Sequence, residues 1–111
     1  MVKVKNSYYK ANFKSVKKMM VRNLNNGQTK DFFGNDILLL QSRLNKNNFY
    51  RKITKDKLAT GDFDYMFSLY DKNDKLLCSI SLGEKRMEIT KGKSSKKYIC
   101  KKTLDISHFE F

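Results

Sequence analysis

The sequence is short of the residues that build catalytic and metal centres. It holds one histidine, His108, and two cysteines, Cys78 and Cys100, which belong to no Cys-x-x-Cys motif. Metal sites and hydrolase sites need several His, Cys, Asp or Glu side chains at ligand or relay spacing. Because no such cluster stands along the chain, we expect a protein without enzymatic activity, without a bound metal and without a cofactor.

The two cysteines lie in apolar, strand-like stretches. A reduced and buried thiol is the common state of a cysteine in such a position. A disulfide between Cys78 and Cys100 is the alternative, if their two strands are neighbours with suitable geometry.

Long apolar segments are also missing. No apolar run approaches the ~18 residues that a membrane-spanning helix needs. The N-terminus is charged from Lys3 onward and lacks the apolar core of a signal peptide. The sequence therefore favours a cytoplasmic protein, and an exported mature domain that has lost its leader is the alternative.

Acidic residues are too few to balance the basic ones, and the formal net charge is +13. Residues 1–30 carry +8 with no acid, and residues 84–102 carry +6, whereas residues 31–83 carry only +1. A field of this strength attracts anionic macromolecules. A lysine-rich solvated surface without a partner is the alternative reading.

Apolar residues are nevertheless frequent enough, at 40% of the chain, for a folded domain. The most regular pattern lies between Asp64 and Leu82. Two stretches in which alternate residues are aromatic or aliphatic flank a polar turn at 71–75, which predicts a β-hairpin. Further strands are predicted at 86–90 and 97–101, with a basic loop at 91–96 between them.

The N-terminal part divides into an arm and a hairpin. Residues 1–12 form a basic arm that is either loose or docked through Tyr8 and Tyr9, and residues 13–111 form a single domain. Asn26-Gly27 favours a two-residue turn. This turn predicts a hairpin in which Leu24 faces Thr29, Arg22 faces Asp31, and Val21 faces Phe32.

One helix of about twelve residues follows. Asn35 is the expected N-cap, Asp36 suits the first turn, and Asn47-Asn48 is the expected stop. The apolar stripe of this helix is Ile37, Leu40 and Leu44. Residues 49–53 are either a short strand or a continuation of the helix, Thr54 is expected to cap one turn ending at Leu58, and the C-terminal residues are either a turn of helix or an edge strand.

These elements predict an α+β fold: a four- to six-stranded antiparallel sheet with one principal helix packed on one face. The predicted core is Val21, Phe32, Ile37, Leu40, Leu44, Tyr65, Phe67, Leu69, Leu76, Cys78, Ile80, Leu82, Ile89 and Ile99. In layout, the strand and Asn-Gly turn, the helix, and the tyrosine-rich strands from Ser15 to Phe109 resemble small uncharacterised α+β domains of Gram-positive bacteria. Many of those are exported or lipid-anchored, and the resemblance implies no activity and no site residues.

Basic residues with interleaved aromatics are typical of nucleic-acid-binding surfaces. The candidate residues of this kind are Lys10, Lys14, Lys17, Lys18, Arg22, Lys93, Lys96, Lys97, Tyr8 and Tyr9. Gly92-Lys93-Ser94 is no nucleotide-binding loop, since Met87 stands where that motif needs its first glycine.

No motif for reading a base sequence is present, so we expect affinity for phosphates rather than for a particular sequence. The predicted function is non-catalytic binding of an anionic partner, with nucleic acid as the first candidate. A protein-interaction or envelope-associated module that binds an acidic protein or an anionic polymer is the alternative. Both depend on whether the two basic blocks share one face of the fold.

Overall fold

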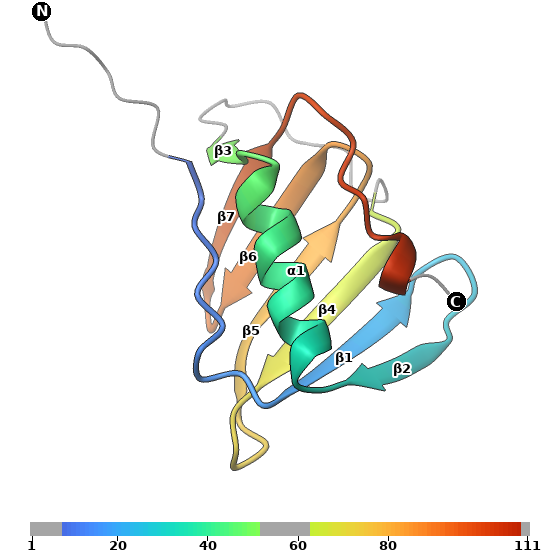
Figure 1. Ribbon diagram of the computed structural model, residues 1–111, viewed down its shortest axis with the longest axis vertical. Helices are drawn as coiled ribbons and strands as arrows, with labels where there is room; N and C mark the ends of the chain where they lie inside the picture. Colours follow the sequence, from blue (N-terminus) through green and yellow to red (C-terminus); the bar gives the residue numbers. More distant parts are fainter. Residues whose placement is uncertain (1–7, 52–62, 110–111) are drawn as a thin grey trace, which may run out of the picture.

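Stretches with period-two alternation form one antiparallel sheet in the computed structural model, which describes residues 8–51 and 63–109 (Figure 1). Within these residues the strands are β1 (Lys18–Asn23), β2 (Thr29–Phe32), β3 (Tyr50–Arg51), β4 (Tyr65–Tyr70), β5 (Leu76–Leu82), β6 (Arg86–Lys91) and β7 (Ser94–Ile99). Their order across the sheet is β2-β1-β4-β5-β6-β7-β3. The α+β class is confirmed.

The described sheet has seven strands, so the prediction of four to six was too low. The additional strand is β3, directly after the helix, where Tyr50 lies opposite Ile99 and Arg51 lies opposite Tyr98. Of the two alternatives for residues 49–53, the short strand is confirmed at Tyr50–Arg51, where pairing with β7 defines it. The expected turn from Thr54 to Leu58 lies outside the described residues.

The first hairpin has a different register from the predicted one. Val21 lies opposite Lys30 rather than Phe32, and Arg22 lies opposite Thr29 rather than Asp31. The turn is longer than two residues, because the backbone N–H of Asn23 donates to the carbonyl of Gln28 at 2.8 Å. The side chain of Asn23 also accepts a hydrogen bond from the N–H of residue 25 at 2.9 Å, which favours the wider turn. A shift of two residues keeps every side chain on its predicted face.

The central hairpin, β4 with β5, is confirmed, but its alternation breaks near the turn. Leu69 pairs with Cys78 and Tyr70 pairs with Leu76, so Leu77 is an extra residue on β5. A bulge of this kind places the residues on its two sides, Leu76 and Cys78, on opposite faces of the sheet. Leu76, predicted in the core, is therefore 51% exposed.

The helix α1 (Asn35–Lys46) lies across one face of the sheet (Figure 1). Ile37, Leu40 and Leu44 are its buried residues, as the stripe predicts. The N-cap is Gly34 rather than Asn35, with φ of 57° and no side-chain cap hydrogen bond. A positive φ favours glycine, and Asn35 is thereby displaced into the first helical position.

The segment at 91–96 is not the predicted basic loop. Lys91 pairs directly with Ser94, so Gly92 and Lys93 form a two-residue turn between β6 and β7. Gly92 has φ of 55°, as such a turn requires. Lys96 consequently lies on a strand, opposite Ile89.

The two cysteines are both free, which excludes the disulfide alternative. Cys78 lies on β5 and Cys100 follows β7, and β6 separates these two strands in the sheet. Neighbouring strands lie about 4.8 Å apart, so a gap of two strands is too wide for a disulfide.

Both ends of the described chain pack on the helix side of the sheet. The C-terminal residues form a short 3-10 helix, η1 (Ser107–Phe109), rather than an edge strand. Phe109 is fully buried there, with its ring edge-on to Phe32 at 5.1 Å and to Phe67 at 5.6 Å.

The core is larger than predicted. Cys78, Ile89 and Ile99 are half-buried rather than buried. Buried residues that the prediction did not include are Ala11, Phe13, Val16, Met19, Phe49, Met87, Cys100, Leu104 and Phe109.

We expect Phe109→Ala to lower the free energy of unfolding by about 3–5 kcal/mol, because it removes a fully buried ring that contacts two others. Phe33→Ala is the control, since Phe33 is 57% exposed and its loss should change stability by less than about 0.5 kcal/mol. Urea unfolding of both variants measures the difference. Equal effects of the two substitutions would show that η1 does not complete the core.

Candidate functional site

A cleft of about 700 Å³ lies between the N-terminal segment, residues 8–17, and the helix side of β5, β6 and β7. A volume of this size is typical of small-ligand sites. The residues that line it come from both basic blocks of the sequence, 10–16 and 91–98, and from the central hairpin.

The N-terminal segment forms one wall of the cleft and runs beside α1 (Figure 1). Two side chains of α1 hold it by accepting backbone hydrogen bonds: Asn45 Oδ1 from Ala11 N at 2.6 Å, and Gln41 Oε1 from Phe13 N at 2.7 Å. Asn45 Nδ2 also donates to the carbonyl of Ala11 at 3.2 Å. The wall is therefore fixed by side-chain amides that replace the backbone pairing of a strand.

The floor of the cleft is apolar. The bulge places Leu77 beside Cys78, and Ile89 comes from the next strand. The remaining apolar lining residues are Phe13, Val16 and Leu69. Tyr9 and Tyr98 also line the cleft, and their rings pack against each other with centroids 5.2 Å apart. An apolar or aromatic group can lie on this floor without leaving polar groups unpaired.

Three lysines line the cleft together with this apolar floor: Lys10 from the N-terminal segment, Lys91 from β6 and Lys96 from β7. All three are exposed. Among the described residues that line the cleft, none is acidic. The local field is therefore positive, and it favours an anionic group placed above an apolar surface.

The ionisable groups in the cleft walls do not oppose this field. Burial raises the pKa of Tyr9 above its ordinary value, and the neighbouring Cys78 and Tyr98 raise it further. Burial also raises the pKa of the Cys78 thiol, an effect that Lys91 partly offsets. Both side chains are consequently neutral at physiological pH, which leaves the lysines as the charged groups of the described lining.

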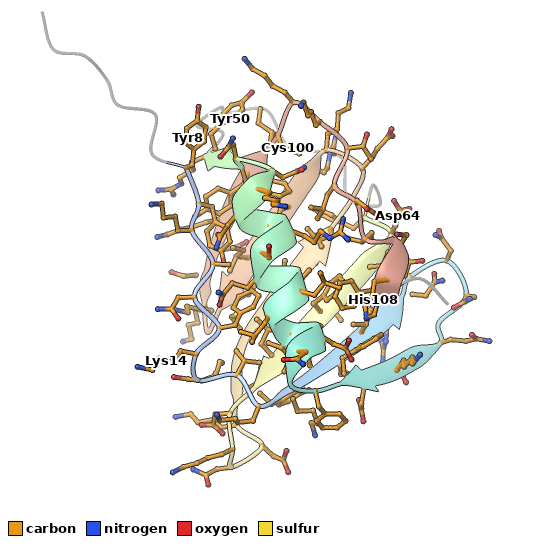
Figure 2. All side chains as sticks on the ribbon, in the orientation of Figure 1. Tyr8, Lys14, Tyr50, Asp64, Cys100 and His108 are labelled. Carbon is orange, nitrogen blue, oxygen red and sulfur yellow. The ribbon has the colours of Figure 1, made fainter. Side chains whose placement is uncertain are left out.

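The structure brings some of the predicted site residues together at this cleft. Lys10, Lys96 and Tyr9 line it. Lys14 is exposed and lies between two lining residues, and Figure 2 shows its side chain pointing away from α1. Lys93 is exposed at the tip of the β6–β7 turn, next to the lining residue Ser94.

Other predicted site residues lie elsewhere. Arg22 and Lys97 are on the face of the sheet opposite α1, in the row where Lys97 faces Glu88. Lys18 is on that face too, where it pairs with Asp74 at 3.1 Å and lies over the ring of Tyr70. Lys17 is exposed just before β1 and does not line the cleft.

Sequence reasoning missed Lys91 and Leu77 as residues of the cleft. The sequence analysis predicts a loop at 91–96, although the spacing of two between Ile89 and Lys91 places both residues on one face of a strand. The predicted core includes Leu76 rather than Leu77, because the bulge that turns Leu77 toward the cleft leaves no sign in the alternation. The position of Lys91 on a strand could have been predicted from its spacing, whereas the bulge at Leu77 could not.

A second pocket, of about 450 Å³, lies at the other end of the N-terminal segment, where α1 ends. Figure 2 shows Tyr8 and Tyr50 together at this place, and the two residues form an isolated β-bridge. The complete described lining of the second pocket is Tyr8, Lys46, Asn47, Asn48, Tyr50, Lys101 and Lys102. It contains three lysines and no acid.

His108, the one histidine, contacts Asp36 through Nε2 at 2.7 Å and ties η1 to the first turn of α1. In the last turn of α1, Arg43 forms an ion pair with Asp105. Hydrogen bonds from Ser107, together with Arg43, hold the pKa of Asp105 below its ordinary value. Within the described ranges no three His, Cys, Asp or Glu side chains form a group that could hold a metal ion.

Comparison of the chain with models of protein families, with curated proteins and with solved structures finds no match. Among residues 8–51 and 63–109, no helix is long and apolar enough to cross a membrane. The cleft and its charges therefore carry the functional argument by themselves.

We expect Asn45→Ala to release the N-terminal wall of the cleft, because it removes two hydrogen bonds to Ala11. Amide hydrogen exchange at Ala11 should become faster, and the free energy of unfolding should fall by about 1–2 kcal/mol. Ser42→Ala, at an exposed position of the same helix, is the control. Unchanged exchange at Ala11 in the Asn45 variant would contradict the role of Asn45 as the anchor.

Proposed function

We propose that the protein is a non-catalytic binding protein for an anionic macromolecule, with single-stranded nucleic acid as the first candidate, bound at the cleft. The observation that supports this most directly is the joining of both basic blocks at one place. Lys10 comes from the first block and Lys91 and Lys96 from the second, and they share the cleft with an apolar floor.

The combination of floor and lysines favours a single strand over a duplex. In a duplex the bases are stacked and paired, and phosphates are what a protein surface meets first. In a single strand a base is free to leave the stack and to lie on an apolar or aromatic surface, while its phosphates meet basic side chains. The cleft offers both kinds of contact within one lining.

An acidic protein or an anionic envelope polymer is the alternative partner. Such a polymer would use the lysines and leave the apolar floor empty, so occupancy of the floor separates the two candidates. The partner also decides the compartment, since nucleic acid implies a cytoplasmic protein and an envelope polymer implies export.

The first test of binding at the cleft replaces its three lysines by glutamine. The variant Lys10→Gln/Lys91→Gln/Lys96→Gln should bind a labelled oligothymidylate at least ten-fold more weakly near 0.1 M salt, with a log–log salt slope flatter by about 2, because each single-strand contact contributes ~0.7. Fluorescence anisotropy across a salt titration measures both quantities.

The control for this variant removes the same charge at other places. Arg22→Gln/Lys30→Gln/Lys72→Gln changes exposed residues on β1, β2 and the β4–β5 turn, none of which lines the cleft. It should retain most of the affinity and of the salt slope. Equal losses in the two variants would mean that binding follows net charge alone, and the proposed site would be wrong.

The second test uses Cys78 as a reporter of the floor. At mildly alkaline pH, which offsets the raised pKa of this thiol, a bound oligothymidylate at ten times its Kd should slow alkylation of Cys78 by about ten-fold. Mass spectrometry of the Cys78 peptide measures the rate. Polyglutamate is the comparison, and it should leave the alkylation rate of Cys78 unchanged because it does not occupy the floor. An oligonucleotide that binds without slowing alkylation of Cys78 would contradict contact with the floor and would favour the alternative partner.

A further inference from the structure

The second pocket has the composition of a phosphate site rather than of a site for an apolar group. Lys46, Lys101 and Lys102 supply positive charge, and two tyrosine side chains supply hydroxyl donors. No acidic side chain is among the residues described in its lining. Ammonium and hydroxyl donors without a competing carboxylate suit the oxygens of a phosphate group.

The three lysines of the second pocket come from two different segments of the chain. Lys46 is in the last turn of α1, where a basic residue commonly offsets the partial negative charge of the helix C-terminus. Lys101 and Lys102 follow β7 instead. Asn47 Nδ2 donates to the carbonyl of Lys102 at 2.8 Å and so holds that segment against the end of the helix. The two backbone segments that carry these lysines are therefore held together at the second pocket.

The second pocket and the cleft are joined by consecutive residues. Tyr8 lines the second pocket, whereas Tyr9 lines the cleft. The backbone here is fixed, since Tyr9 N donates to the carbonyl of Phe49 at 2.7 Å and Tyr8 bridges to Tyr50. A chain molecule that leaves the cleft at Tyr9 consequently meets the second pocket one residue away.

We propose that the second pocket binds phosphate groups of the same single strand that occupies the cleft, so that the bound strand crosses the N-terminal segment at Tyr8 and Tyr9. This inference rests on the proposed function, because it extends the cleft into a longer nucleic-acid track. The two pockets then act on one ligand, and the second contributes only when the strand is long enough to reach it.

A length series tests this track. Oligothymidylates of about 4 and about 12 nucleotides, lengths within the range of sites for single strands, are bound to the wild type and to Lys46→Gln/Lys101→Gln/Lys102→Gln. The wild type should bind the longer strand with a salt slope steeper by about 2, for three further contacts at ~0.7 each. The variant should bind the short strand like the wild type and lose the added slope on the long strand.

The control is again Arg22→Gln/Lys30→Gln/Lys72→Gln, which removes the same charge away from both pockets. Matching urea unfolding curves show that each variant is folded, and the carbonyl of residue 102 that Asn47 contacts is retained in the substitution. If the second-pocket variant and the control show the same affinity and slope on the long strand, the track is wrong while binding at the cleft stands. If the wild type binds neither strand, the proposed function fails together with the track.

Discussion

The fold is constrained by the small size of its helix relative to its sheet. A helix of twelve residues is about 18 Å long and about 10 Å wide, whereas seven strands span about 29 Å. The helix alone covers only part of one face. Phe109 closes the side over β1, β2 and β4, and the N-terminal segment closes the side over β5 to β7. The N-terminal segment covers its side of the sheet only in part, and the cleft lies between this segment and the strands.

The distribution of charge follows from the same arrangement. The N-terminal segment covers part of the strands that carry the second basic block, so Lys10 lines the same cleft as Lys91 and Lys96. Lysines that face one another repel, which destabilises the free protein unless an anion lies between them. The opposite face of the sheet is different, because Lys18 pairs with Asp74 and Lys97 faces Glu88. The described lining of the cleft therefore holds lysines without an acidic residue, whereas Lys18 and Lys97 on the opposite face each have an acidic neighbour.

The sequence predicted most elements because their signals are local. The alternation in β4 and β5, the stripe Ile37, Leu40 and Leu44, and the asparagines that end the helix each depend on residues a few positions apart. Predictions failed where one local choice competed with another, as in the turn after β1, where the side chain of Asn23 stabilises a wider turn than Asn-Gly prefers. The bulge at Leu77 depends on the partner strand, so no pattern in its own residues could predict it. The sequence left open a strand or a helix at Tyr50–Arg51, and pairing with β7 decides for the strand.

The sequence by itself determined the α+β class, the helix at 35–46 and the strong positive charge, since these follow from periodicity and composition. Three of the residues that line the cleft, Lys10, Lys96 and Tyr9, were also among the candidate site residues of the sequence. Only the tertiary structure decided that Lys10 and Lys96, 86 positions apart, line one cleft, and that Arg22 and Lys97 lie on the other face. The physical reason is that charge is a property of residues, whereas a shared surface depends on which segments pack together to bury the apolar face of the sheet.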